Sequence, residues 1–254
     1  MEWFWSALPP AALLPWLLAG ALAGGLARGF SGFGAALICV PLMAAAIGPR
    51  QAVPLMLLLE ALAIATLTAP AWRIADRREV GFLAIGAALG TPLGAAVLLV
   101  ADQRLLRWFV SLLILGLLLL LASGWRFRGR PRPGLAVGVG VMGGVLGGVA
   151  MASGPPVLAY LLGRDAPARE LRAAFALYLA AGGILAGMSF ALSGLLVAAL
   201  LPGFLLAAPL YAIGIWGGAR LFGLASEETF RRACYAMIAA AALLSMPALD
   251  GILR

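Results

Sequence analysis

The chain has 254 residues but no histidine and no lysine, and only 11% of its residues are charged. With histidine absent and only Cys39 and Cys234 as cysteines, the usual ligands of haem, zinc and iron–sulfur clusters are missing. The same absence excludes a Ser-His-Asp or Cys-His catalytic site. We therefore expect no metal, no cofactor and no enzyme activity, and we interpret the cysteines as small core residues.

The scarcity of charge also bounds the fold. A soluble domain needs about a quarter of its residues charged, whereas 64% of this chain is hydrophobic. The apolar residues form blocks close to the roughly 20 residues that cross a bilayer as a helix. The sequence predicts an all-α integral membrane protein with a single domain embedded in the lipid bilayer.

The net charge of +8 comes from 18 arginines against 10 acidic residues. These arginines lie between the apolar blocks, where they set the orientation of a membrane protein. No basic face alternates with aromatic residues, so we expect no nucleic-acid binding. The N-terminus lacks the basic region of a signal peptide, and Trp3, Trp5 and Trp16 resemble an interfacial belt.

An arginine- and proline-rich linker at 126–133 divides the chain into two halves, 1–125 and 134–254. A constant shift aligns Gly24-Gly25 with Gly143-Gly144 and Arg50 with Arg169, which indicates an internal repeat. Each half contains a region rich in glycine or proline that interrupts a helix, at 28–34 and at 147–156. The expected helices cover 11–28, 34–47, 50–71, 80–100 and 104–123, then 134–150, 155–163, 169–192, 196–219 and 229–247.

Segment 155–163 is too short to span a bilayer, so each half is expected to open with a pair of short or broken helices followed by three spanning helices. Whether each opening pair spans fully or re-enters stays open. If each pair returns to the side from which it entered, one face carries Arg73, Arg77, Arg78, Arg126, Arg128, Arg130, Arg132, Arg164, Arg169, Arg172, Arg220, Arg231 and Arg232. The other face then carries only Arg50, Arg104, Arg107 and Arg254. A single net crossing removes this bias, so the positive-inside rule favours two inverted repeats, with both termini periplasmic.

Three motifs carry a resemblance to a known family. They are the stretch from Gly24 to Gly34 that runs on to Val40-Pro41-Leu42, the stretch Ser153-Gly154-Pro155-Pro156, and Gly90-Thr91-Pro92-Leu93-Gly94. Their order resembles the sulfite exporter TauE/SafE family over nearly the whole chain. The resemblance implies a bacterial inner-membrane transporter of sulfite or of an organosulfonate such as sulfoacetate. One departure is Gly32-Phe33-Gly34-Ala35, where a fuller glycine run is expected.

Broken helices are a common way to build an anion site, because exposed N–H groups and half-helix dipoles face the ligand. Both breaks can aim helix N-termini at one centre. The glycines can instead serve close helix packing, Arg28 can be a topology charge, and an intramembrane tyrosine often only bonds a neighbouring helix. The candidate substrate-binding residues are Arg28, Gly29, Ser31, Gly32, Gly34, Ser153, Gly154 and Tyr160.

Glu60 is the only acidic residue far from a predicted helix end. Its roles remain open between proton coupling, structural pairing (with Arg28 among the candidates) and direct substrate contact. We expect a secondary transporter of a small anion. The alternatives are a carrier of another solute, such as a divalent metal or a carboxylate, and a non-transporting membrane assembly or anchor subunit. A homo-oligomer stays open.

Overall fold

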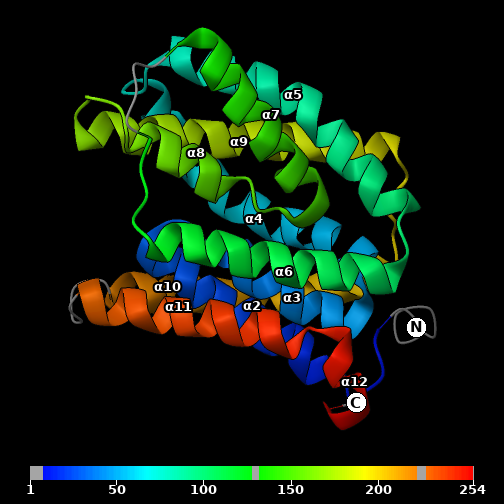
Figure 1. The fold of residues 1–254 in the computed structure, drawn as a ribbon. Helices are drawn as coiled ribbons and strands as arrows, with labels where there is room; N and C mark the ends of the chain where they lie inside the picture. Colours follow the sequence, from blue (N-terminus) through cyan, green and yellow to red (C-terminus); the bar gives the residue numbers. More distant parts are fainter. Residues whose placement is uncertain (1–7, 128–131, 222–226, 254) are drawn as a thin grey trace. The chain divides into compact units, whose positions relative to one another are not determined.

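The computed structural model describes residues 8–127, 132–221 and 227–253, and in these ranges it is helical without strands (Figure 1). Trp3, Trp5, Arg128, Arg130 and Arg254 lie outside the described residues. The all-α prediction is confirmed. The helices are α2 (Leu14–Ser31), α3 (Ala35–Ile47), α4 (Pro49–Trp72), α5 (Arg77–Val100), α6 (Gln103–Ala122), α7 (Pro133–Ala150), α8 (Gly154–Leu161), α9 (Ala168–Leu192), α10 (Leu200–Leu221), α11 (Glu227–Leu244), the 3-10 turn η1 (Pro247–Leu249) and α12 (Asp250–Leu253).

Five of the described helices, α5, α6, α7, α9 and α10, are long and apolar enough to cross a membrane. Their large apolar side chains are not all buried. On α5, Ile85, Leu89 and Leu93 recur every fourth residue and are each more than half exposed, which places them on one face of the helix. Such a face is stable in lipid and unfavourable in water. The prediction of a multi-pass membrane protein is confirmed.

The chain divides into two compact units, each described here by itself. Unit 1 contains residues 1–59, 101–118 and 195–254, and unit 2 contains residues 60–100 and 119–194. Both units therefore combine helices from the two halves of the sequence. The repeats at 1–125 and 134–254 are a different division of the chain, and they stay a prediction.

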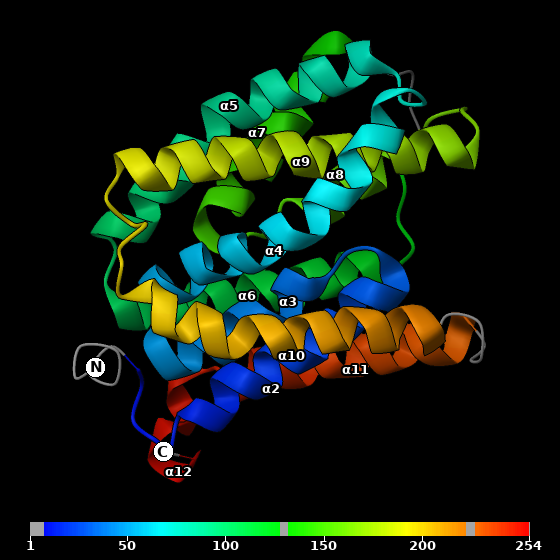
Figure 2. The same cartoon turned by 180° about the vertical axis from the view of Figure 1, so that it is seen from behind.

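Unit 1 is built on a close parallel pair, α2 and α10 (Figures 1 and 2). A Cβ atom added to Gly25 would lie 2.4 Å from the Tyr211 carbonyl oxygen, and one added to Gly29 would lie 2.0 Å from that of Ile215. Gly214 and Gly218 of α10 approach the α2 backbone in the same way. Glycines four residues apart on both helices thus allow backbone contact, which is a common basis of helix association in lipid.

Unit 2 repeats this arrangement with α5 and α7, which also run parallel. A Cβ atom on Gly90 would lie 2.1 Å from the Val141 carbonyl oxygen, and one on Gly94 would lie 2.2 Å from that of Val145. Gly144 of α7 likewise faces the backbone of α5. Helix α2 opens the first half as α7 opens the second, and α5 and α10 are each the fourth helix of their half. The two units therefore use equivalent pairs.

Each opening helix also folds back on its successor as an antiparallel hairpin. In unit 1, Gly20 of α2 faces Leu42 of α3, and Gly24 faces Cys39. In unit 2, Gly147 of α7 faces Ser153 at the start of α8, and Gly143 faces Val157. Each half therefore opens with two helices around a break, and of the second pair α7 is long enough to cross a membrane whereas α8, with 8 residues, is short.

The second hairpin returns to the end of unit 2 at which it begins. The Phe127 N–H, shortly before α7, donates to the Ala159 carbonyl near the end of α8. Arg164 then pairs with Asp76, in the α4–α5 loop. The segments 72–79, 124–127 and 159–164, which contain Arg73, Arg77, Arg78, Arg126 and Arg164, therefore share one end of unit 2. The side of the membrane on which this end lies stays a prediction.

The end of α2 differs from the prediction, whereas the end of α7 agrees with it. Helix α2 continues beyond the predicted residue 28 to Ser31, and α7 ends at Ala150, as the predicted helix 134–150 does. The predicted breaks at 28–34 and 147–156 nevertheless both include glycine as a sign of interruption. Gly29 and Gly148 instead stay helical because each meets the backbone of a partner helix, which leaves no room for a larger residue. The breaks are correspondingly shorter, at 32–34 and 151–153.

Candidate functional site

The first break lies in unit 1, between α2 and α3, at Gly32-Phe33-Gly34. Gly32 has φ 74° and Gly34 has φ 89°, a left-handed conformation in which glycine pays no penalty. The Ser31 hydroxyl donates to the Ala27 carbonyl at 2.7 Å and lies 2.5 Å from the Phe33 carbonyl. These contacts fix a sharp reversal of the chain, after which α3 begins without a side-chain cap.

Arg28 lies in the last turn of α2 and is 95% buried, with a relative exposure of 5%. Its guanidinium donates to the Gly32 carbonyl at the break. A cation at this place is favourable because the last carbonyls of a helix carry partial negative charge. Arg28 thus stabilises the end of α2, and it brings a buried positive charge to the first break.

The remaining candidates in unit 1 have different surroundings. Gly29 lies against the α10 backbone, and this packing is sufficient reason for a glycine there. At Gly32 and Gly34 an added Cβ atom would meet nothing within 4 Å, so φ and not crowding requires glycine. Binding of a substrate by these residues and by Ser31 stays a prediction.

The second break lies in unit 2, where Met151 has φ 53° and Ser153 precedes α8. The Ser153 side chain makes no capping hydrogen bond to α8. Gly154 is buried against Phe175, whose ring a Cβ atom would approach to 3.3 Å. Pro155 and Pro156 have no N–H, so the polar donors at the start of α8 are few.

Tyr160, the last candidate in unit 2, is buried and belongs to a polar cluster that the sequence analysis did not predict. Its hydroxyl donates to the Glu79 carboxylate at 2.5 Å, and its ring lies 5.8 Å from that of Phe127. Arg164 donates to Asp76 at 3.1 Å and lies 3.9 Å from the second carboxylate oxygen of Glu79. The cluster connects α8 to the start of α5. This contact matches the alternative in which Tyr160 hydrogen-bonds a neighbouring helix.

Asp76 also caps α5, because its carboxylate accepts the N–H groups of Arg78 and Glu79 at 3.0 and 3.2 Å. Burial raises the pKa of Asp76, but the hydrogen bonds from Glu79 and Arg164 outweigh it and hold that pKa below the ordinary 3.8. The sequence did contain one signal for this turn. Asp76 followed by Glu79 has the spacing of a capping box.

Glu60 is buried within α4, with a relative exposure of 8%, and it is engaged in interactions. It is the first residue of unit 2, immediately after the boundary within α4. The structure thus agrees with the expectation of a carboxylate at depth in a helix. Its role in proton coupling, pairing or substrate contact stays a prediction.

Comparison with known proteins adds the decisive observation. The model of the family described as sulfite exporter TauE/SafE matches residues 16–245. The chain belongs to the sulfite exporter TauE/SafE family. This family consists of membrane transporters of anions such as sulfite, so its members are not enzymes. No curated protein and no solved structure matches the chain.

Proposed function

We propose that the chain is a secondary transporter that carries sulfite or an organosulfonate such as sulfoacetate across the bacterial inner membrane. The observation that carries the proposal is the hairpin at the start of each half of this TauE/SafE chain, broken at its tip by 32–34 or 151–153. Transporters often bind their substrate where a helix is interrupted, because backbone groups are available there.

At the first break, the buried charge of Arg28 supports selection of an anion. A guanidinium presents several N–H donors in one plane and matches two oxygens of a sulfonate or sulfite group. The start of α3, at Gly34 and Ala35, adds the positive end of a helix dipole with no side chain capping it. Residues 28–35 thus combine charge and donors suited to an oxyanion.

At the second break, the Ser153 hydroxyl and the Gly154 N–H are the donors that suit an anion. The Tyr160 hydroxyl already donates to Glu79, so it can contact a substrate only after this hydrogen bond opens. We therefore assign Ser153 and Gly154 to binding, and Tyr160 to a step that accompanies movement of α8. Alternating access would follow from movement of helices around the bound anion.

Sulfite uptake into proteoliposomes tests the role of Arg28. Arg28→Gln should reduce saturable sulfite uptake at least tenfold, since it removes the charge and leaves a shorter, uncharged polar side chain. Arg232→Gln is the matched control, because Arg232 is 77% exposed and pairs only one helical turn away with Glu228. If both variants transport sulfite like the parent protein, Arg28 is not part of the site.

Thermal stability separates the candidate solutes. Sulfite or sulfoacetate should raise the Tm of the purified protein, whereas Ni²⁺ and a simple carboxylate such as acetate should not. Stabilisation by Ni²⁺ alone would favour a metal carrier, and no stabilisation by any anion would favour an assembly or anchor subunit.

Glu60 supplies the proposed proton coupling. A carboxylate at depth in a membrane helix is costly and commonly functional. Glu60→Gln should abolish the acceleration of sulfite uptake by an imposed pH gradient while leaving anion exchange measurable. If the pH gradient still accelerates uptake in this variant, coupling does not run through Glu60.

A further inference from the structure

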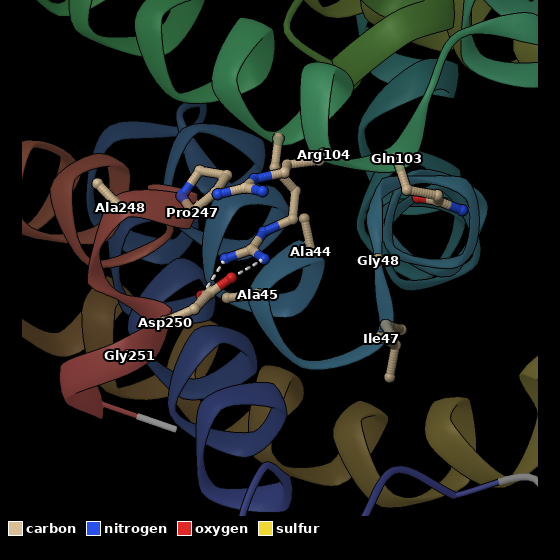
Figure 3. A pocket seen from close by; sticks show the side chains of 11 residues that line it. Ala44, Ala45, Ile47, Gly48, Gln103, Arg104, Pro247, Ala248, Asp250 and Gly251 are labelled. Carbon is tan, nitrogen blue, oxygen red and sulfur yellow. Dashed lines mark hydrogen bonds and ion pairs between the residues drawn. The ribbon is translucent and has the colours of Figure 1, made fainter.

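Unit 1 contains a pocket of about 780 Å³ that belongs to neither helix break. Its walls are the end of α3, the start of α6 and the C-terminal turn formed by η1 and α12 (Figure 3). Small residues, among them Ala44, Ala45 and Ala248, leave the space open, and Gln103, Arg104 and Arg107 supply its polar groups. The pocket is therefore lined largely by small side chains, with two arginines on one side.

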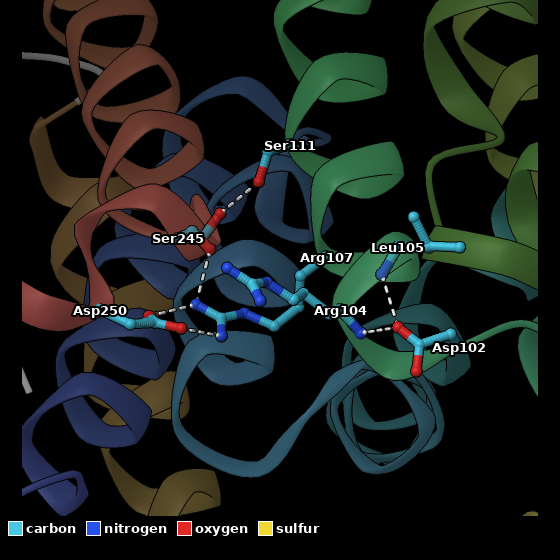
Figure 4. A network of polar contacts seen from close by, with 7 residues as sticks. All are labelled: Asp102, Arg104, Leu105, Arg107, Ser111, Ser245 and Asp250. Atoms are coloured by element: carbon cyan, nitrogen blue, oxygen red, sulfur yellow. Dashed lines mark hydrogen bonds and ion pairs between the residues drawn. The ribbon is translucent and has the colours of Figure 1, made fainter.

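Arg107 already holds an oxyanion of this chain. Its two terminal nitrogens each lie 2.7 Å from a carboxylate oxygen of Asp250, and one of them also donates to the Ser245 carbonyl at 2.9 Å (Figure 4). This two-pronged contact is the geometry in which arginine binds carboxylates, sulfonates and phosphates. The Arg107 Nε–H is buried and has no hydrogen-bond partner among the described residues.

Arg104 lies three residues earlier on α6, and Figure 4 shows both arginine side chains extending toward the segment that carries Ser245 and Asp250. No described carboxylate forms an ion pair with Arg104. The nearby Asp102 caps α6 instead, accepting the N–H groups of Arg104 and Leu105 at 2.8 and 3.1 Å. Among the residues lining the pocket, Asp250 is the one acid beside two arginines, so the pocket carries excess positive charge.

We propose that this pocket binds a small oxyanion (a sulfite, sulfonate, sulfate or phosphate group) between Arg104 and Arg107, with Asp250 as an internal competitor. The excess positive charge attracts the anion. The buried Arg107 Nε–H has no acceptor among the described residues, and buried donors in proteins are usually hydrogen-bonded. An anion that reaches Arg107 replaces the Asp250 carboxylate and so releases α12 from α6. If this anion is also the transported anion, the pocket is a capture site for the substrate, and this one step rests on the proposed function.

The reaction rate of a cysteine introduced at position 248 measures anion binding in the pocket directly and involves no transport. Ala248 is exposed and lines the pocket, whereas Cys39 and Cys234 are buried. In detergent, Ala248→Cys should react several-fold faster with a sulfonate-bearing methanethiosulfonate than with a neutral one, and sulfate should slow this reaction at constant ionic strength. Ala198→Cys, exposed in unit 1 and outside the pocket, is the control and should show neither effect.

Two further substitutions should act in opposite directions on Ala248→Cys. Arg104→Gln removes an attracting charge and should abolish the preference for the sulfonate reagent. Asp250→Asn removes the competitor and should increase the protection by sulfate. Unchanged rates in both variants, or equal protection at Ala198→Cys, would overturn the proposal. A Tm measured without anion checks that each variant is folded.

The same assay distinguishes the two sources of the oxyanion. Protection by sulfate in detergent identifies a free anion. Protection that requires nanodiscs of phosphatidylglycerol, and is absent in zwitterionic phosphatidylcholine, identifies the phosphate of an anionic lipid head group at the same arginines. The assay and the Arg28→Gln transport experiment fail independently, because the first measures binding at Ala248 and the second measures uptake.

Discussion

Two buried tyrosines show how far the role of a single residue depends on its partners. The Tyr160 hydroxyl donates to Glu79, whereas the Tyr178 hydroxyl is buried without a hydrogen-bond partner among the described residues. The sequence places both in apolar segments and offers no means to distinguish them. Contacts between α8 and α5 join residues about 80 positions apart, and no local pattern encodes such a contact.

The tyrosine pair gives a matched prediction. Tyr160→Phe should destabilise the protein by about 1 to 3 kcal/mol, because it leaves a buried carboxylate without one of its donors. Tyr178→Phe should be neutral or slightly stabilising, since it removes a hydroxyl that is buried unpaired. Thermal unfolding in the same detergent compares both with the parent protein. Equal losses would show that the Tyr160–Glu79 hydrogen bond contributes nothing specific.

Asp76 gives a prediction that depends on pH. Its folded pKa lies below the ordinary value of 3.8, so its contribution to stability is present above about pH 4 and is lost as the pH falls through the folded pKa. Asp76→Asn should therefore lower the Tm by a constant amount between pH 5 and 8, and the difference should shrink below about pH 4. A difference that persists unchanged at the lowest pH would assign the effect to packing and not to charge.

At the scale of the elements, the sequence predicted the ten main helices to within a few residues, since apolar blocks bounded by proline, glycine and arginine are a local signal. The sequence left open whether the glycines bind substrate or pack helices together. The structure gives Gly29 a packing contact with Ile215, and its place in a substrate site stays a prediction. A glycine in a tight helix interface differs from one at a break only through the helix that packs against it. The identity of that partner helix depends on contacts between residues far apart in the sequence.

The α5–α7 interface tests this packing. Gly90→Ala should lower the Tm strongly, because the added carbon would lie 2.1 Å from the Val141 carbonyl oxygen and the helices must separate. Overpacking of this kind costs about 1 to 3 kcal/mol or more. Gly81→Ala, on the same helix with nothing within 4 Å of the added carbon, is the control and should be neutral or stabilising. Similar effects of both substitutions would contradict the close approach.

For the whole molecule, the helix pairs are more informative than the order of the helices. Each half contributes its opening hairpin to one unit and its fourth helix to the other, so α2 pairs with α10 and α7 pairs with α5. Neither half therefore provides the main partner of its own opening helix, and neither is expected to be stable when expressed alone. A repeat found by aligning the sequence with itself cannot reveal this exchange, because it is a property of contacts.

Labelling of single cysteines in intact cells tests the inverted topology that these pairs suggest. Ser123, directly after α6, and Ala168, at the start of α9, are exposed. Both should be cytoplasmic, because the second hairpin returns to the end of unit 2 at which it begins. Ala198 and Ala248 should face the periplasm, where positive charge is rarer. A membrane-impermeant maleimide should therefore label Ala198→Cys and Ala248→Cys in whole cells, but Ser123→Cys and Ala168→Cys only after permeabilisation. Opposite behaviour of Ser123→Cys and Ala168→Cys would mean that the second hairpin crosses the membrane, and the halves would then not be inverted.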